Sequence, residues 1–417
     1  MKGTLGSGNA QRYDFRGKPN NGTIEVNVLN NQFTLVGNPY PSAIDAVAYI
    51  HDPENASIIS GTLYFWEQDT SINSHNIQAY QGGYGTYTIS SDGLVETYTP
   101  ATFNSYNNDG SINTSNGVSA SGKRPRRYIP IGQGFMVEGI ANGVVKAKNS
   151  HRVFEKESGP NSEFFKIANS KNKTNNATSI FSEIPESYKR FRLNIDFNAS
   201  YTRQLVETFH SSATEGFDYG LESKTNEDNV LLNDAYFLNN ENLYIAEALA
   251  FSEETEINLV FKITNQSNIN ISIADIQNFD NNLPIYVHDT DTNNYINLRD
   301  QDFQLTLDTG LYNDRFKIVF KEDTNTLNIV ENSVDELKIF QNNTLGELHI
   351  INPNGLKLKG FKLYDITGKK VMQDNLKSSN DRYAYSTNHL SDGVYIIKVK
   401  SANRQFFSKK VIISNKK

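Results

Sequence analysis

Apolar and polar residues alternate with period two along most of this 417-residue chain, and that period indicates β-strands. Near the N-terminus, "TIEVNVLNNQFTLVG" places Ile24, Val26 and Val28 on one side of such a strand. A second alternating run follows the Asn30-Asn31 pair. Because asparagine tolerates the positive φ of a tight turn, we expect the two runs to form a hairpin.

Helical periodicity is almost absent. The string "PSAIDAVAYI" suits a turn or two of helix, with Pro41 and Ser42 at its start and Ile44 and Ala48 facing inward. Elsewhere, strand-like runs are separated by Asn, Asp and Gly at short spacing, without the helices that connect parallel strands. The pattern therefore predicts antiparallel sheets.

Two polar segments divide the chain into three β-rich modules. Residues 156–179 are rich in Lys, Asn and Ser, and residues 322–336 are acidic and polar, so we expect both to be linkers. The modules between them are residues 1–155, a β-rich domain truncated at its N-terminus, residues 180–321 and residues 337–417. We expect an all-β fold with three modules in series, of which the last two are antiparallel β-sandwiches.

Composition excludes several classes of protein. The chain has no cysteine, and therefore no disulfide or thiolate metal site. It has no run of 18 or more apolar residues, so we expect no transmembrane segment. Its N-terminus lacks the apolar core of a signal peptide.

The net charge of −7 conceals an asymmetry along the chain. Residues 338–417 contain 15 Lys and Arg against 5 Asp and Glu, a charge of +10, which leaves −17 for residues 1–337. A basic segment suggests nucleic acid or an anionic surface. These lysines are spread along alternating strands rather than packed in a block, so a solvated basic face is the favoured interpretation and we expect no nucleic-acid partner.

No complete motif for catalysis or cofactor binding occurs in the sequence. "GVSASGKR" has the spacing of a phosphate loop, but Arg124 stands where Ser or Thr holds magnesium, and Pro125 prevents the required helix. The seven histidines share no metal-ligand spacing, and neither H-E-x-x-H nor G-x-S-x-G occurs. We therefore expect no cofactor and predict that the chain is not an enzyme.

An acidic string, "DTDTNNYINLRD", places Asp289, Asp291 and Asn293 close to the spacing of a calcium loop. Asn294 and Asp300 occupy the positions where such a loop has Gly and Glu. Both flanks alternate like strands, so we favour a β-hairpin with an acidic turn and expect no metal. A weak calcium site in that turn stays open as the alternative.

Aromatic residues of the first module form a candidate ligand surface. Tyr40, Tyr64, Trp66 and Tyr84 are suited to stacking on sugar rings. The alternative, which we favour, is that they fill a small β core.

The C-terminal strings are the most specific in the chain. "LKIFQNNTLGELHI", "LKGFKLYDITGKKVMQ" and "YSTNHLSDGVYIIKVKSANRQFFSKKVIIS" together resemble the type A C-terminal sorting domain of proteins exported by the type IX (Por) secretion system of Bacteroidota. One departure is "IFQNN", where the family usually has a Pro-Asn-Pro turn. The positions that carry the motif are Tyr364, Asp365, Gly368, Lys369, Asp392, Gly393, Tyr395, Lys398, Lys409 and Lys410.

Local patterns predict how the strands of that C-terminal segment are oriented. In "GVYIIKVK", Tyr395, Ile397 and Val399 share one face of a strand and lysines occupy the other, which predicts one buried and one basic face. Gly368 and Gly393 stand at strand entries, where we expect positive φ or a bulge. A basic module of this kind is suited to electrostatic steering toward an acidic receptor.

The resemblance implies an Ig-like sorting domain, a secreted or cell-surface location, and a type IX translocon with sortase-like processing machinery as partners. It also implies attachment to surface lipopolysaccharide. Because such cargo first crosses the inner membrane with a signal peptide, we expect this chain to be a fragment of a longer protein. "LVGNPYPSAIDA", "GTLYFWEQ" and the β-rich strings after residue 180 resemble flavobacterial surface proteins, so the upstream modules are expected to be scaffold or adhesin-like.

Two alternatives stay open. In the first, the upstream modules are a carbohydrate-binding accessory part of a larger exported hydrolase, in contact with glycans. In the second, a catalytic site lies within these residues.

Overall fold

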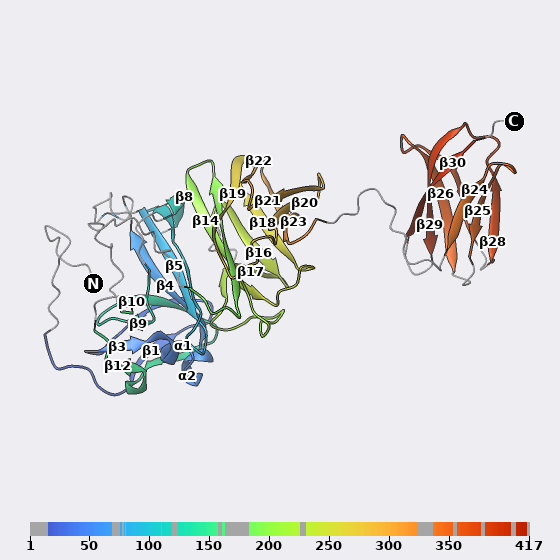
Figure 1. The fold of residues 1–417 in the computed structure, drawn as a ribbon. Helices are drawn as coiled ribbons and strands as arrows, with labels where there is room; N and C mark the ends of the chain where they lie inside the picture. The colour runs from blue at the N-terminus through green and yellow to red at the C-terminus, as the bar shows by residue number, and fades with distance from the viewer. Residues whose placement is uncertain are drawn as a thin grey trace. The chain divides into compact units, whose positions relative to one another are not determined.

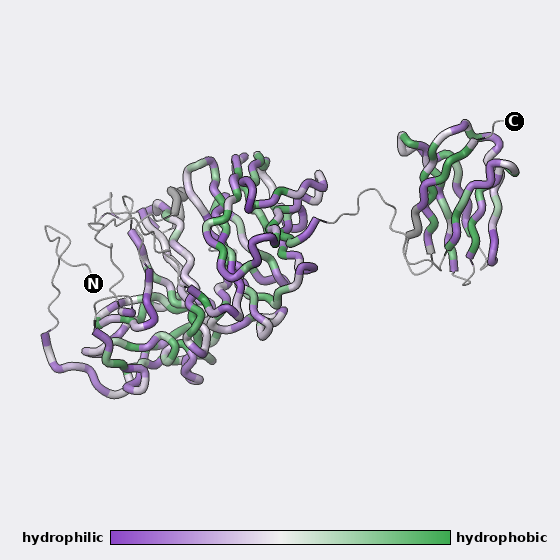
Figure 2. Tube along the Cα trace, viewed as in Figure 1, coloured by the Kyte–Doolittle hydropathy of each residue, from purple (hydrophilic) through white to green (hydrophobic). Residues whose placement is uncertain are grey.

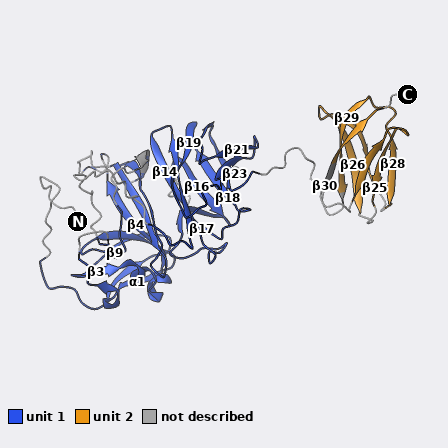
Figure 3. Ribbon diagram, in the orientation of Figure 1, with its two compact units in different colours: residues 1–322 blue, residues 323–417 orange. Residues whose placement is uncertain are grey.

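The computed structural model describes residues 16–68, 76, 79, 81–109, 111–118, 124–156, 161–162, 183–225, 231–322, 337–352, 357–376, 380–401 and 406–414. It divides into two compact units, residues 1–322 and 323–417 (Figure 3). Strands dominate both units, and hydrophobic and hydrophilic positions alternate along them (Figure 2). The expected all-β fold is confirmed. Within the described residues, no helix is long and apolar enough to cross a membrane.

The N-terminal part of unit 1 contains three sheets (Figure 1). The largest has the order β2-β10-β4-β5-β7-β8 with β6 on β5, and the smaller ones are β1-β11 and β12-β3-β9. Side chains from all three meet in one core, which includes Val28, Ile44, Leu63 and Phe135. The strands are β1 Ile24–Val28, β2 Phe33–Gly37, β3 Ala43–Asp45, β4 Ile59–Gln68, β5 Gln81–Ile89, β6 Glu96–Thr99, β7 Thr102–Tyr106, β8 Ile112–Val118, β9 Tyr128–Ile129, β10 Gly134–Gly139, β11 Gly143–Ala147 and β12 Arg152–Val153.

The hairpin expected at the N-terminus is wrong in its pairing. The turn is present, with Asn31 at φ 58°, but β1 pairs with β11 and β2 pairs with β10. Val28 and Val36 both enter the same core, so the two strands approach it from different sheets. Alternation predicts that a strand has one buried face, but it does not identify the neighbouring strand.

The short helix also starts later than expected. Residues Ala43–Asp45 form β3, and Asp45 caps helix α1, Ala46–Ile50, by accepting a hydrogen bond from the Val47 amide at 3.0 Å. Ile44 is buried as expected, but it lies in the strand. Helix α2, Pro53–Ala56, and the 3-10 turn η2, Asn149–His151, pack beside α1 and β11.

The second part of unit 1 is one eleven-stranded sheet of order β21-β20-β23-β18-β16-β17-β14-β13-β19-β22, with β15 on β17. One face of most strands feeds a single core that includes Phe191, Phe237 and Phe261, so the sheet curls over that core. The pairing is antiparallel except between β14 and β17, which run parallel. Its strands are β13 Lys189–Phe197, β14 Tyr201–Phe209, β15 Ser223–Thr225, β16 Asn233–Asn239, β17 Asn242–Leu249, β18 Glu256–Ile263, β19 Ser267–Gln277, β20 Tyr286–Asp289, β21 Asn294–Asn297, β22 Phe303–Leu307 and β23 Gly310–Val319.

Two buried arginines of β13 connect the parts of unit 1. Arg190 donates from Nη1 to the Glu96 carbonyl at 3.0 Å and from Nη2 to Thr97 Oγ1 at 2.7 Å. Arg192 donates from Nη1 to the Tyr98 carbonyl at 2.7 Å. Burial lowers the pKa of Arg190 to about 10, which leaves the guanidinium protonated at neutral pH. The two guanidinium groups of β13, in the eleven-stranded sheet, therefore donate charged hydrogen bonds directly to β6. The first two expected modules belong to one compact unit.

Unit 2 is a sandwich of two antiparallel sheets, β24-β25-β28 and β27-β26-β29-β30. Ile339 and Ile350 from the first sheet meet Phe361, Ile397 and Val411 from the second in one core. This arrangement agrees with the expected sorting-domain sandwich. "IFQNN" lies almost wholly within β24. The strands are β24 Lys338–Asn342, β25 Glu347–Ile351, β26 Leu358–Asp365, β27 Lys370–Asp374, β28 Arg382–Ser386, β29 Gly393–Ser401 and β30 Phe406–Ile413.

We predict that Arg190→Met lowers the free energy of unfolding of unit 1 by about 3 kcal/mol, because it leaves buried acceptors on β6 without a donor. Trp66 is the single tryptophan of the chain, so its fluorescence during urea unfolding reports on unit 1 alone. Arg152→Met is the matched control, since Arg152 is half-buried and donates from Nε to Ser42 Oγ. Equal losses in the two variants would contradict the prediction.

Candidate functional site

The residues of the sorting motif gather on the four-stranded sheet of unit 2. Register places Asp365 opposite Tyr395 and Lys410 opposite Ile396. The ten positions lie at the end of β26 (Tyr364, Asp365), in the following turn (Gly368, Lys369), at the start of β29 and within it (Asp392, Gly393, Tyr395, Lys398), and in β30 (Lys409, Lys410).

Asp365 organises the turn between β26 and β27. Its Oδ1 accepts hydrogen bonds from the Thr367 amide at 2.9 Å, the Thr367 hydroxyl at 2.7 Å and the Lys369 amide at 3.0 Å. These bonds, first the one from the Thr367 hydroxyl, lower the pKa of the Asp365 carboxyl. Gly368 adopts φ 80°, a left-handed conformation that glycine accepts without strain. The motif "YDITGK" therefore encodes a hairpin turn, which is followed by a bulge at Val371 of β27, opposite Leu363 and Tyr364.

The second glycine of the motif has a different role. Gly393 has neither the positive φ nor the bulge that we expected as alternatives, because it pairs in regular register with Ile413. A methyl group placed on it would lie 3.8 Å from the nearest atom, on the Tyr395 ring. Tyr395 is buried, and its hydroxyl donates to the Ser391 carbonyl at 2.8 Å. The start of β29 is therefore held by tyrosine packing and this hydrogen bond.

One face of the same sheet is basic. Tyr395, Ile397 and Val399 are buried as expected, while Lys398 and Lys400 point outward. Four exposed lysines on β26, β29 and β30, together with two exposed isoleucines, form what we call the basic face: Lys362, Lys398, Lys400, Lys410, Ile396 and Ile412. Lys362 lies directly opposite Lys398, an unfavourable pairing of like charges.

The structure separates the four residues of the candidate aromatic surface into two buried ones and two that lie together on β4 and β5. Tyr40 is 1% exposed, and its single hydroxyl proton is shared between the Gly22 and Ala147 carbonyl oxygens, which lie 2.6 and 2.7 Å from the hydroxyl oxygen. Tyr64 is also buried and donates to Glu138 Oε2 at 3.0 Å. Their hydroxyls find acceptors inside unit 1, so both rings belong to the interior rather than to a surface.

Trp66 and Tyr84 do lie together, and Tyr106 joins them. The ring centroids of Trp66 and Tyr84 are 5.0 Å apart, and those of Trp66 and Tyr106 are 5.8 Å apart. Tyr84 is 46% exposed. A methyl group on Gly82 would lie 2.7 Å from Trp66 Cζ2, so this glycine lets the indole lie against β5. We call Trp66, Tyr84 and Tyr106 the aromatic platform.

The acidic turn forms the expected hairpin between β20 and β21. Both oxygens of Asp289 accept from Arg315, whose Nε and Nη2 are each 2.8 Å away. Burial opposes ionisation of Asp289, but the bonds from Arg315 outweigh it and lower the pKa of the carboxyl. Asp291 lies 3.3 Å from the same guanidinium, and Asn293 turns the chain at φ 51°. A calcium ion would have to displace Arg315 from Asp289. Residues 119–123 of the phosphate-loop string lie outside the described residues.

Three buried glutamates form a cluster that the sequence did not reveal. Glu207, Glu222 and Glu247 are each at most 1% exposed. The parallel pairing of β14 with β17 sets Glu207 directly beside Glu247. A register shift near Tyr244 on β17 precedes this pairing. Glu222 joins them from the residue before β15, and its carboxylate accepts from the Ala248 amide at 3.0 Å.

Burial dominates the protonation of this cluster. It raises the pKa of Glu222 to about 8 and that of Glu247 to about 7. It also raises the pKa of Glu207 well above its ordinary value, with repulsion from Glu247 adding to the effect. The neighbouring Asn239 amide and the Glu207 carboxyl counteract part of the rise at Glu247. The pair Glu207 and Glu247 therefore holds at least one proton at neutral pH.

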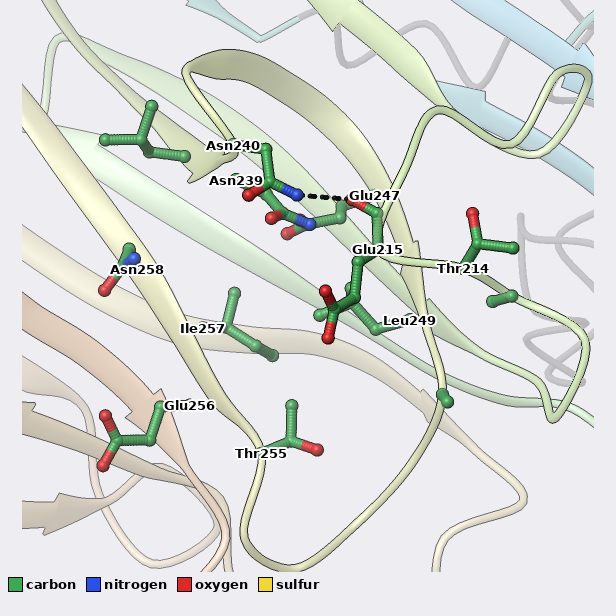
Figure 4. A pocket seen from close by; sticks show the side chains of 13 residues that line it. Thr214, Glu215, Asn239, Asn240, Glu247, Leu249, Thr255, Glu256, Ile257 and Asn258 are labelled. Carbon is green, nitrogen blue, oxygen red and sulfur yellow. Dashed lines mark hydrogen bonds between the residues drawn. The ribbon is translucent and has the colours of Figure 1, made fainter.

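Glu247 lines a cleft of about 460 Å³ (Figure 4). The cleft lies between three segments: residues 213–215, the turn from β16 to β17, and the start of β18. In that turn, Asn240 and Glu241 have φ values of 45° and 67°. Asn240 Nδ2 donates to the Glu215 carbonyl at 2.7 Å and so ties the turn to the loop. None of the described residues forms a group of acidic, His or Cys side chains that could hold a metal ion.

Two members of the cluster had a weak signal in the sequence. Glu207 is two residues from both Leu205 and Phe209, so it falls on the same face of a strand as these apolar residues. Glu247 stands among apolar residues in "YIAEALA". An acidic residue at a position that alternation assigns to the buried face of a strand suggests either a strand edge or a buried carboxyl. Nothing in the sequence marks Glu222.

We predict from the protonation of the glutamate cluster that the free energy of unfolding of unit 1 falls as the pH rises from about 5 to 8. The folded state keeps protons on Glu222 and Glu247 up to about pH 8 and pH 7, whereas the unfolded chain releases them near the ordinary value of 4.5. The folded state therefore binds more protons in this window, and the free energy of unfolding falls by about 1.4 kcal/mol per pH unit for each proton that only the folded state holds.

Urea unfolding followed by Trp66 fluorescence at pH 5, 6, 7 and 8 measures this slope. The double variant Glu222→Gln with Glu247→Gln is expected to flatten it, and Glu253→Gln, at an exposed position, is expected to leave it unchanged. A double variant with the slope of the parent chain would show that the cluster is not the cause.

Comparison with known proteins gives two family matches. The family described as "Domain of unknown function (DUF8693)" matches residues 3–320, and "Secretion system C-terminal sorting domain" matches residues 293–414. The second match begins inside unit 1, whereas the compact unit 2 begins at residue 323.

Other comparisons add little. No curated protein matches the chain. One solved structure, "Tp47, the 47-Kilodalton Lipoprotein of Treponema pallidum", matches at 10% identity over 89% of this chain and 86% of that chain, with a TM-score of 0.20, and this likeness carries no argument.

The sorting domain makes the protein a cargo of the type IX secretion system, which exports it from the cell and with whose machinery it interacts. The first match covers most of the chain. The chain therefore belongs to the DUF8693 family and ends in a type IX secretion C-terminal sorting domain.

Proposed function

We propose that the folded unit 2 is the export signal, that its basic face is the surface the export machinery contacts, and that unit 1 is the passenger, which serves as scaffold or adhesion surface outside the cell. The observation that carries the proposal is the basic face. Lys362, Lys398 and Lys410 lie on adjacent strands around Ile396 and Ile412, and none of these lysines makes an ion pair with another described residue.

Electrostatics favour an acidic receptor for this face. Like charges on facing strands, such as Lys362 and Lys398, repel each other in the free module. An acidic partner would remove that repulsion and attract the module at a distance, within a Debye length of about 8 Å at physiological ionic strength. The two exposed isoleucines add apolar contact at the centre of the face.

The charge on the remainder of the chain supports the assignment of roles. Residues 1–337 carry −17 against +10 for residues 338–417, so an acidic receptor would attract the module and repel the passenger. This difference orients the cargo with its C-terminal module toward the receptor. Processing by sortase-like machinery and attachment to surface lipopolysaccharide belong to the same proposal.

We predict that the double variant Lys398→Gln with Lys410→Gln, made in the full-length gene of the native host, lowers the exported fraction about tenfold. It removes two charges from the basic face and leaves the buried face of each strand intact, so the module stays folded. Immunoblots of the medium, the outer membrane and the cell interior measure the exported fraction.

The matched control is Lys338→Gln with Lys357→Gln, which removes the same charge from exposed positions outside the basic face. Its export is expected to equal that of the parent. Equal loss in both double variants would show that net charge, and not this face, matters. Parent-level export in both would rule out a role for the lysines of the basic face.

A second candidate function is glycan binding by unit 1. The observation that favours it is the aromatic platform, where Trp66, Tyr84 and Tyr106 present ring faces and edges in mutual contact. Such rings stack on the apolar faces of sugars. An exported passenger meets polysaccharides outside the cell, which fits either an adhesion role or an accessory part of a hydrolase.

We predict that Trp66→Ala abolishes binding on a glycan array to which the parent chain binds, because it removes the ring that both tyrosines contact. Phe340→Ala is the control: Phe340 is 40% exposed, lies in unit 2 and stacks on His349. A parent chain that binds no glycan across broad panels would count against this second function and leave the export proposal untouched.

A further inference from the structure

The cleft that Glu247 lines shares no residue with the basic face or the aromatic platform. Its volume of about 460 Å³ falls within the range of small-molecule sites. Leu238, Leu249 and Ile257 give it apolar walls, and Asn239 and Glu247 give it polar groups. Figure 4 shows Asn239, Leu249 and Ile257 among the side chains that line it. The cleft therefore offers contacts to an apolar stem and to a polar head group.

The carboxyl of Glu247 lacks a cationic partner. No hydrogen bond of good geometry reaches an oxygen of Glu247 or of Glu207 beside it, and the groups close to Glu247, the Asn239 amide and the Glu207 carboxyl, carry no positive charge. The cations on neighbouring strands are engaged elsewhere: Lys317 pairs with Glu256 at 2.6 Å, and Lys224 donates to Asn242 Oδ1 at 3.1 Å. Buried carboxyls are normally paired or hydrogen-bonded, so this one is available to a ligand.

The groups around Glu247 select the charge of that ligand. Glu207 faces it from β14, Glu222 from the residue before β15 with Asp218 close by, and Tyr244 from its own strand. The rim carries two further carboxylates, Glu215 and Glu256, of which Glu256 is paired with Lys317. An anion would be repelled by this arrangement. A nitrogen cation with several N–H donors complements it.

We propose that the cleft binds a small aliphatic amine, and binds a diamine best. One ammonium group donates to Glu247, the alkyl chain lies along Leu249 and Ile257, and the second ammonium group reaches the rim carboxylate of Glu215. Asn239, which lies next to Glu247, turns aside to admit the first ammonium. The ligand then supplies the positive charge that the glutamate cluster lacks.

Binding is coupled to loss of a proton from the cluster. The ammonium pairs with an ionised Glu247, so a proton held by Glu207 and Glu247 leaves when the amine enters. The affinity for amines therefore increases from pH 5 to pH 8, while the amine itself stays protonated over that range. Glu222 and Tyr244 stay neutral over most of that range because both are buried.

Isothermal titration calorimetry of the whole chain with 1,5-diaminopentane tests the proposal. Buffers of different ionisation enthalpy report the protons released. Pentylamine, 1-pentanol, glutarate and calcium chloride are the comparison ligands. We expect binding in the order diamine, monoamine and alcohol, no binding of glutarate or calcium, and proton release on binding at pH 6.

Two variants locate the site. Glu247→Gln is expected to weaken binding of both amines at least tenfold, and Glu215→Gln, at an exposed position, is expected to weaken the diamine alone. Glu253→Gln, exposed and outside the cleft, is the matched control and is expected to bind like the parent. The unfolding profile of each variant, followed by Trp66 fluorescence, verifies that unit 1 is intact.

Three results with the organic ligands would overturn the proposal. They are no heat of binding for either amine at millimolar concentration, equal binding of the amine and the alcohol, and full amine binding by Glu247→Gln. Preferential binding of calcium would equally overturn it, because it would identify a metal ligand in place of an organic cation. None of these outcomes depends on the export function of unit 2.

Discussion

Two guanidinium groups sealed inside unit 1 are the interaction on which the rest of that unit depends. The side chains of Arg190 and Arg192 extend from β13 in the eleven-stranded sheet and donate hydrogen bonds to backbone carbonyls of β6 in the N-terminal part of the unit. A buried charged group is costly without hydrogen-bond acceptors, so the two parts of unit 1 keep the relative position that brings the β6 carbonyls to these guanidinium groups. Further polar contacts act at the same junction, such as the Tyr219 hydroxyl on the Ile50 carbonyl at 2.9 Å. The aromatic platform and the glutamate cleft thereby belong to one body.

The sequence predicted which residues form strands far better than it predicted how strands meet. Alternation located β1, β2 and β29 because one face of each strand is buried. It could not show that β1 pairs with β11, or that β14 and β17 run parallel, because pairing is set by long-range packing that leaves no local mark. Helix α1 begins later than expected because residues 43–45 form a strand and Asp45 supplies the helix cap.

Among the functional residues, those in local motifs were predicted from the sequence, and those brought together by strand pairing were not. The sorting motif was recognisable because its turn is local: Asp365, Thr367 and Gly368 are neighbours in sequence and determine one hairpin. Trp66 and Tyr84 were predicted as a surface, but Tyr40 was not separable from them without knowing that its hydroxyl reaches the Ala147 carbonyl. The cleft was missed because Glu207 and Glu247 become neighbours only through strand register.

The central claim is that a folded module, and not a lysine-rich tail, directs export, and Ile397→Asp tests it most directly. Ile397 is fully buried in the core of unit 2, so an aspartate there unfolds the sandwich and leaves every lysine in place. Export of this variant from the native host is compared with that of a chain lacking residues 338–417. The account predicts that both remain inside the cell envelope. Export of Ile397→Asp at the parent level would contradict it.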